Sequence, residues 1–220
     1  MLFVTGDLHG DLMRLKSPEM KKLRKGDYLL VCGDFGFLWD GSRREQKLLD
    51  RLGKLKFHIL FVEGAHENYR LLSQIQPTEY CGGMARVISG KLVQLCRGYV
   101  FSLCGKKIFA FGGGDNPDLD VELLDEDLPL QRLPTEQDVA LARQQLAQNE
   151  NDVDFIVTHD CPSAVRRMLR MDSNEFHQLN AYFDEVAQIC RFRQWFFGSF
   201  HVDKKIPPYY HALFKDVVGV

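Results

Sequence analysis

The stretch LFVTGDLHG, residues 2–10, begins with apolar and β-branched residues and ends with an acid and an imidazole. Its first part has the length and composition of a buried strand. Asp7 and His9 follow that strand directly. In open α/β sheets, ligand sites gather outside the carboxyl ends of the strands. The stretch therefore predicts an α/β fold with polar residues of a site at its strand ends.

The same pattern recurs along the chain. Four further apolar runs with acids or histidines at their ends are YLLVCGD (28–34) with Asp34, HILFVEG (58–64) with His66 and Glu67 after it, DFIVTHD (154–160) with His159 and Asp160, and QWFFGSFH (194–201) with His201. A single such residue is more often a turn former or a satisfied interior histidine. Repetition at every apolar strand end favours one shared site, and imidazole with carboxylate suits Zn, Mn or Fe.

The remaining segments predict helices and a meander of short strands. The helices are expected at 42–55 after Ser42, from Pro134 and Thr135 to about Asn149, and at 174–190. The meander is expected at 86–114, an acidic loop at 115–127, and a terminal strand at 209–218. Apolar strands on both sides of a meander indicate an α/β (α+β) fold of two packed mixed β-sheets flanked by helices.

The bulk composition is that of a soluble globular protein. A length of 220 residues suits a single domain, 1–220, with 45% hydrophobic and 26% charged residues. The net charge of −2 gives no electrostatic reason to expect nucleic acid or a membrane surface as a partner. Six cysteines without a C-x-x-C pair favour a reducing compartment, and no signal peptide or apolar span is visible, so we expect a cytoplasmic protein.

The polar strand ends resemble the motifs of a known family. GDLHG (6–10), GDFG (33–36), GAHE (64–67), TH (158–159) and GSFH (198–201) come in the order of the calcineurin-like metallophosphoesterases. The family pattern is G-D-x-H-G, G-D, G-N-H-[DE], a lone H, and G-H-x-H, and the longer strings resemble its small stand-alone bacterial members. The resemblance implies a four-layer αββα sandwich and metal-dependent hydrolysis of phosphoesters.

The resemblance also implies roles for individual residues. Asp7, His9 and His201 would hold a first divalent metal, Mn, Fe or Zn, and Asp34 would bridge it to a second. His159 would bind the second metal. His66 would protonate the leaving oxygen or orient the phosphate. Two such cations would clamp the phosphoryl oxygens of an in-line displacement.

Two positions depart from the family pattern, and both fall on the second metal. Ala65 stands where the family has Asn, and Ser199 stands where it has the first His of G-H-x-H. Asp160 is a poor replacement, because adjacent strand residues point to opposite faces. Glu67 is expected to anchor its loop or to orient His66. The second metal site is therefore expected to be weakened or absent, while the first keeps its ligands.

Three interpretations of function follow. One is a phosphoester hydrolase acting on a phosphorylated small molecule or a phosphoprotein, with nucleic acid disfavoured because the chain lacks a basic, aromatic-interleaved surface. Another is a pseudophosphatase that binds a phosphoryl ligand or a protein. In the third, the residues at 65 and 199 were introduced to inactivate an enzyme.

Arg43 and Arg44 either contact a phosphate or form a solvated first turn of a helix. The solvated turn is the favoured interpretation of these two residues.

Overall fold

The computed structural model describes residues 1–114, 132–169 and 178–220. The acidic segment 115–127 and the first residues of the helix expected at 174–190 lie outside these ranges. The described helices are Pro18–Lys21 (α1), Arg43–Gly53 (α2), Tyr69–Ser73 (α3), Glu136–Gln148 (α5), Ser163–Met168 (α6) and Gln178–Ile189 (α7), with a 3-10 turn at Arg14–Lys16 (η1). None of them is both long and apolar enough to cross a bilayer.

The first sheet has seven strands in the order β13-β1-β2-β3-β6-β5-β4. Their bounds are Leu2–Thr5 (β1), Tyr28–Val31 (β2), His58–Phe61 (β3), Thr78–Tyr80 (β4), Gly83–Ser89 (β5), Leu92–Leu95 (β6) and Val217–Gly219 (β13). β1, β2, β3 and β6 run parallel, whereas β13 and the β5–β4 pair are antiparallel to their neighbours. The sheet is therefore mixed, with a parallel centre.

The second sheet has six strands in the order β11-β12-β10-β9-β8-β7. Their bounds are Tyr99–Leu103 (β7), Lys106–Phe111 (β8), Phe155–Thr158 (β9), Gln194–Phe197 (β10), Lys204–Ile206 (β11) and Tyr210–Ala212 (β12). The four inner strands are parallel and the two edge strands antiparallel. Within the segment 86–114, β7 and β8 form a hairpin, because they pair on either side of Cys104 and Gly105.

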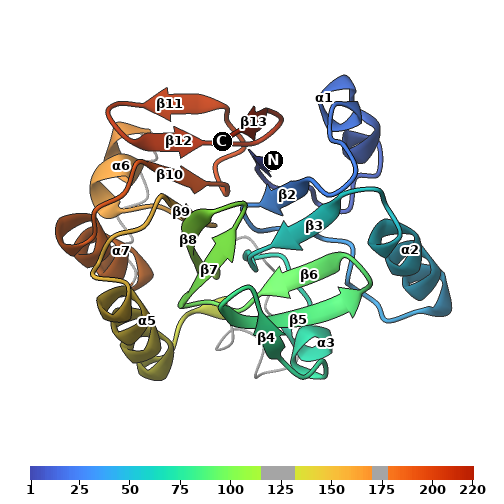
Figure 1. Ribbon diagram of the computed structural model, residues 1–220, viewed down its shortest axis with the longest axis horizontal. Coiled ribbons are helices and arrows are strands. Elements are labelled where there is room, and N and C mark those ends of the chain that lie inside the picture. The colour runs from blue at the N-terminus through green and yellow to red at the C-terminus, as the bar shows by residue number, and fades with distance from the viewer. Residues whose placement is uncertain (115–131, 170–177) are drawn as a thin grey trace.

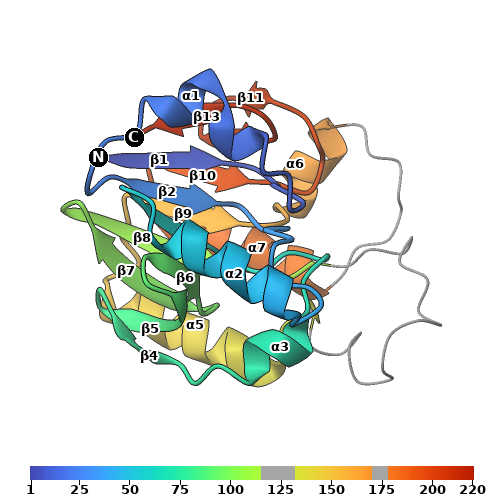
Figure 2. The ribbon, with the colours of Figure 1, turned by 90° about the vertical axis from the view of Figure 1, so that its right-hand side faces the viewer.

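The two sheets pack face to face, and helices cover their outer faces. Figure 1 shows α5, α6 and α7 outside the second sheet, and α1 and α2 outside the first. Figure 2, turned by 90°, shows α2 lying across the first sheet. The predicted fold class, two mixed sheets flanked by helices, is confirmed.

Alternation along the central strands explains this layering. In β2, Leu30 belongs to the cluster between the sheets, whereas Leu29 and Val31 belong to the cluster beneath the helices of the first sheet. Because side chains alternate across a strand, a run of apolar residues buries both faces at once. The continuous apolar runs in the sequence are therefore what a sandwiched sheet requires.

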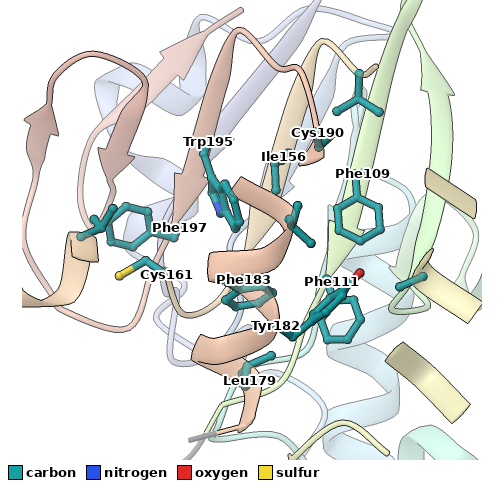
Figure 3. Close-up of a cluster of buried hydrophobic side chains, with 14 of the residues drawn as sticks. Phe109, Phe111, Ile156, Cys161, Leu179, Tyr182, Phe183, Cys190, Trp195 and Phe197 are labelled. Carbon is teal, nitrogen blue, oxygen red and sulfur yellow. The ribbon is translucent and has the colours of Figure 1, made fainter. Parts of the chain in front are cut away.

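The cluster between α7 and the second sheet is rich in aromatic rings. Figure 3 shows Tyr182 and Phe183 of α7 pointing toward rings from the strands beneath them. Phe183 meets Trp195 and Phe111 edge to face, with ring centroids 5.5 and 5.7 Å apart. Such pairs add about 0.5–1.5 kcal/mol each beyond burial. This packing fixes β8 and β10, whose carboxyl ends carry part of the site.

Two of the predicted helix starts are confirmed, but the last predicted strand is not. Ser42 caps α2, and Thr135 forms a capping box with Asp138 at the start of α5, as predicted. The single strand expected at 209–218 is wrong: β12 joins the second sheet and β13 the first. A bend at Leu213–Asp216 separates them, and three backbone amides in it donate to the carboxylate of Asp203.

Candidate metal centre

The polar residues predicted at strand ends converge on one edge of the sandwich. Asp7 and His9 follow β1, Asp34 follows β2, His66 follows β3, His159 follows β9, and His201 follows β10. Parallel strands of a sheet present their carboxyl ends at the same edge. Three of these strands belong to the first sheet and two to the second. The site therefore lies where the two sheets meet.

Six side chains form three overlapping groups of metal-ligand atoms. Within each group the ligand atoms lie within 4.8 Å of one another, and the groups are Asp7 with His9 and His201, His9 with Asp34 and His66, and Asp7 with Asp34 and His159. The Nε2 atoms of His9 and His201 are 2.9 Å apart. Nε2 of His201 is also 3.4 Å from an Asp7 oxygen. The first-metal residues inferred from the sequence are thus brought together.

Local backbone conformation aims these side chains at the centre. His9, Asp34, Ser199 and His201 have φ values of +46°, +45°, +69° and +51°. Non-glycine residues adopt this left-handed region only when surrounding contacts hold them there. The amides of Leu8 and His9 both donate to the Asp34 carbonyl, at 3.0 and 2.8 Å. The loops after β1 and β2 therefore fix each other.

Glycines let the loops approach the carboxylates closely. A Cβ atom on Gly64 would lie 2.1 Å from Oδ1 of Asp34, and one on Gly198 would lie 2.2 Å from Oδ1 of Asp7. No side chain fits at such distances, so only glycine allows the loops after β3 and β10 to pack against Asp34 and Asp7. Steric exclusion of any side chain therefore explains why both motifs have glycine at these positions.

Asp34 is the most heavily engaged carboxylate of the site. It is buried, and it accepts hydrogen bonds at 2.7 Å from both the backbone amide and Nδ1 of His66. Burial alone would raise the pKa of Asp34, but the charge of His159 and the bonds from His66 outweigh it and hold the pKa well below its usual range. Asp34 is therefore an anion and fixes the orientation of the His66 ring.

His159 is enclosed between the two buried carboxylates. Its Nδ1 lies 3.0 Å from the Cys32 carbonyl and 3.5 Å from Asp7, and its Nε2 lies 3.6 Å from Asp34. Burial would lower the pKa of His159, but the Asp34 and Asp7 carboxylates raise it to about 10. Because a histidine binds a metal in its neutral form, the raised pKa of His159 opposes metal binding at this residue.

His9 behaves differently from His159. Its side chain is 34% exposed, and burial of the rest lowers its pKa despite the attraction of Asp34 and Asp7. A neutral imidazole is the form that binds a metal, so His9 is ready to act as a ligand without losing a proton.

Of the two substituted positions, Ala65 lies near the expected second-metal residue His159, and Ser199 contacts the first-metal residue Asp7. Gly114, after β8, lies near both His159 and Ala65: a Cβ there would be 2.8 Å from Cδ2 of His159 and 3.8 Å from the Ala65 methyl. Ala65 is buried and has no donor atom. Ser199 contacts Asp7 through its backbone amide, at 3.1 and 3.0 Å.

Glu67 anchors the loop after β2. Its buried carboxyl accepts a 2.7 Å hydrogen bond from the Phe35 amide. Burial, reinforced by Asp34, raises its pKa to about 8. Asp34, not Glu67, contacts Nδ1 of His66. The first of the two roles expected for Glu67 therefore matches the geometry.

Asp160 is engaged away from the metal ligands, in agreement with strand alternation. Its Oδ2 accepts hydrogen bonds from Arg166 at 2.9 Å and from Asn180 at 3.0 Å. These contacts tie the end of β9 to α6 and α7. Gly114 was not among the site residues predicted from the sequence, although the glycine run after the apolar strand FAF (109–111) was a usable signal for close approach.

The donor set fits a divalent cation at the first site. Carboxylate oxygens and imidazole nitrogens from Asp7, His9, Asp34 and His201 converge in overlapping ligand groups, and these donors suit Mn, Fe or Zn. At the second site the expected donors that remain are Asp34 and His159, since Ala65 and Ser199 replace the expected amide and imidazole. The donors at the first site therefore fit a divalent cation, and Asp34 and His159 form a further ligand group together with Asp7.

Comparison with known proteins assigns the family. The family model for calcineurin-like phosphoesterases matches residues 2–203. A search of curated proteins finds no match to this chain. The family is typically hydrolytic and binds divalent metals, and the ligand groups described above agree with metal binding. With nearly the whole chain matched and the fold in agreement, the protein belongs to the calcineurin-like phosphoesterases.

Proposed function

We propose that the chain is a metal-dependent phosphoester hydrolase with a complete first metal site and a weakened second one. The observation that carries this proposal is the convergence of Asp7, His9 and His201 on one point, with Asp34 beside them. A divalent cation bound there supplies positive charge to the phosphoryl oxygens and lowers the pKa of water. The cation is Mn, Fe or Zn, and the substrate is a phosphorylated small molecule or a phosphoprotein.

Asp7, Asp34 and His66 would each have a separate role in the reaction. Asp7 is fixed by the Ser199 amide and does not need to reorganise when a cation arrives. Asp34 holds Nδ1 of His66 and so sets the direction of the ring. Nε2 of His66 is then the nitrogen that exchanges a proton with the leaving oxygen. With a third of its side chain exposed, His66 is accessible to a substrate.

The test pairs metal analysis with turnover. Metal content per chain is measured by mass spectrometry, and hydrolysis of p-nitrophenyl phosphate and bis(p-nitrophenyl) phosphate is measured with added Mn²⁺. Asp34→Asn should abolish both turnover and tight metal binding. Asp11→Asn is the matched control, because it makes the same change nearby, in a residue outside all three ligand groups. Equal turnover in the unmodified chain and in Asp34→Asn would refute the proposal and point to a contaminating phosphatase.

A pseudophosphatase is the second candidate, and the loss of donors at Ala65 and Ser199 is what favours it. Two cations normally share the charge of the transferring phosphoryl group, so a chain that holds one cation, or none, is expected to bind phosphate without turnover. Calorimetry with orthophosphate separates the two candidates. Binding in the absence of any Mn²⁺-supported hydrolysis supports the pseudophosphatase and excludes the hydrolase.

A further inference from the structure

A hollow of about 680 Å³ begins beside the metal centre and runs along α2. Gly10 and Gly36 line one end of it. These two glycines touch: a Cβ on Gly36 would lie 2.7 Å from the Gly10 nitrogen and 2.8 Å from Cα of His9. The hollow therefore starts at the backbone that carries His9. Its volume lies within the range of about 300–1,000 Å³ typical of small-molecule sites.

The wall formed by α2 is strongly cationic. Arg43, Arg44, Lys47 and Arg51 all line the hollow. Within the described ranges, none of the four has an ion pair or a side-chain hydrogen bond. Charges of one sign without partners attract a ligand of the opposite sign.

The two acids on the same wall are already occupied. The carboxylate of Glu45 accepts from the amides of Trp39, Asp40 and Gly41, at 2.7, 2.8 and 3.1 Å. Asp40 accepts from the Ser42 amide at 2.7 Å. Both carboxylates serve to close the loop before α2. Neither has an ion pair with a cation of the helix among the described residues, although the hydrogen bonds from Ser42 and, to a smaller extent, the charge of Arg44 lower the pKa of Asp40.

Two of the basic residues stand at the end of α2 that disfavours positive charge, whereas Arg51 lies in the last turn, where the helix dipole favours it. Arg43 and Arg44 occupy the first turn of α2, where the helix dipole disfavours positive charge. Arg43, Lys47 and Arg51 follow one another at a spacing of four residues, which puts like charges side by side on one face. Helix stability does not account for this arrangement, whereas binding of an anion relieves both conflicts.

We propose that this hollow binds a second phosphate group of the substrate while the reacting phosphoryl group sits at the metal centre. The proposal rests on the proposed hydrolase function and narrows its substrates to small molecules that carry two or more phosphates. The planar guanidinium groups of Arg43 and Arg44 suit bidentate contacts to phosphate oxygens. A net charge of −2 and the limited volume favour a small polyanion over nucleic acid.

The binding test compares two charge reversals of equal size. In Arg43→Glu/Arg44→Glu, the acids stand at a helix N-terminus, where they stabilise the helix, so the variant should fold. Lys21→Glu/Lys22→Glu is the control, because it makes the same change at exposed residues of the α1 end that do not line the hollow. Calorimetry of Mn²⁺-loaded protein with tripolyphosphate should show affinity at least ~10-fold weaker in the arginine variant, since each lost charge-assisted hydrogen bond costs about that factor. The control should stay within about twofold of the unmodified chain.

Equal weakening in both variants, or none in the arginine variant, overturns the proposal. A single-stranded oligonucleotide that loses affinity in the arginine variant while tripolyphosphate does not would assign the hollow to nucleic acid instead, and would also overturn it.

A kinetic measurement separates this proposal from the proposed function. We expect the ratio of kcat/KM for fructose 1,6-bisphosphate over fructose 6-phosphate to exceed one and to fall at least ~10-fold in the arginine variant, because only the bisphosphate reaches the hollow. Hydrolysis of both compounds with an unchanged ratio refutes the second-phosphate site and leaves the hydrolase intact. No hydrolysis of either, with tripolyphosphate binding still lost in the arginine variant, refutes the hydrolase and leaves the binding site intact.

Discussion

Restoring both missing donors, with Ala65→Asn and Ser199→His, should create a tight second metal site. Of the four protein ligands that the family pattern gives this metal, the chain retains Asp34 and His159. Loss of a residue that merely supports a ligand costs about 10- to 100-fold in metal affinity, so the two missing ligands together should cost at least ~10²- to 10⁴-fold. That range corresponds to about 2.7–5.5 kcal/mol.

The surroundings of the two positions bear on both changes. Ala65 is buried, and its methyl group would lie 3.8 Å from a Cβ on Gly114, so Gly114 leaves that side of the methyl group free of a side chain. At position 199 the backbone is left-handed, with φ of +69°, and His is among the residues that tolerate this region. The buried amide that Ala65→Asn introduces would lack a partner without metal, so the double variant should be less stable than the unmodified chain until Mn²⁺ is added.

The assay measures metal stoichiometry and the rise in Tm with Mn²⁺ concentration. The double variant should bind two ions per chain and gain more Tm than the unmodified chain, because tighter binding stabilises the folded state more. Val202→His is the control: it adds an imidazole at an exposed position of the same loop, away from the expected ligand position. If the unmodified chain already binds two ions as tightly as the double variant, the reasoning about Ala65 and Ser199 is wrong.

Three further predictions test other features of the structure. Gly198→Ala should lower the free energy of unfolding in urea by about 1–3 kcal/mol and reduce the metal content. The reason is that the added methyl group would lie 2.2 Å from Asp7. An unchanged metal content would contradict this close approach. Arg97→Met should cost about 3–5 kcal/mol by leaving the buried Glu63, now 2.5 Å from Arg97, without its countercharge, and Glu63→Gln in the same chain should recover much of the loss. Burial raises the pKa of Cys96 to about 11, so its alkylation by iodoacetamide at pH 8 should be ~100-fold slower than that of a thiol with a pKa of about 9. The alkylation rate should increase about tenfold per pH unit toward pH ~11. A rate that reaches a plateau near pH ~9 would contradict this.

Much of the fold could be predicted from the sequence because both faces of the central strands are buried. Apolar runs such as 28–31 and 194–197 have no alternation, which is typical of strands sandwiched between layers. Their polar carboxyl ends then located the site, because parallel strands share an edge. The error at 209–218 arose because two short strands and the bend between them have the composition of one longer strand. Nothing in that local pattern says that the two halves join different sheets.

The details of the site depend on contacts between distant segments, which a single sequence does not reveal. The bond from His66 to Asp34 and the enclosure of His159 by two carboxylates join residues far apart in the chain. Likewise, the sequence favoured a solvated helical turn for Arg43 and Arg44, whereas the fold places them along a hollow that Gly10 also lines. The spacing of residues within a helix can be read from the sequence, but the segments that pack next to that helix cannot.

The order of the strands has a consequence for biosynthesis. His9 and His201, which face each other across the first metal position, are separated by 192 positions in the chain, and β1 takes β13 as one of its two neighbours. A chain still on the ribosome therefore exposes Asp7 and His9 without the residue that completes their group. The group of Asp7, His9 and His201 cannot form until His201 has been translated and β10 has docked, so a translation product truncated before β10 should hold the ion more weakly than the full chain.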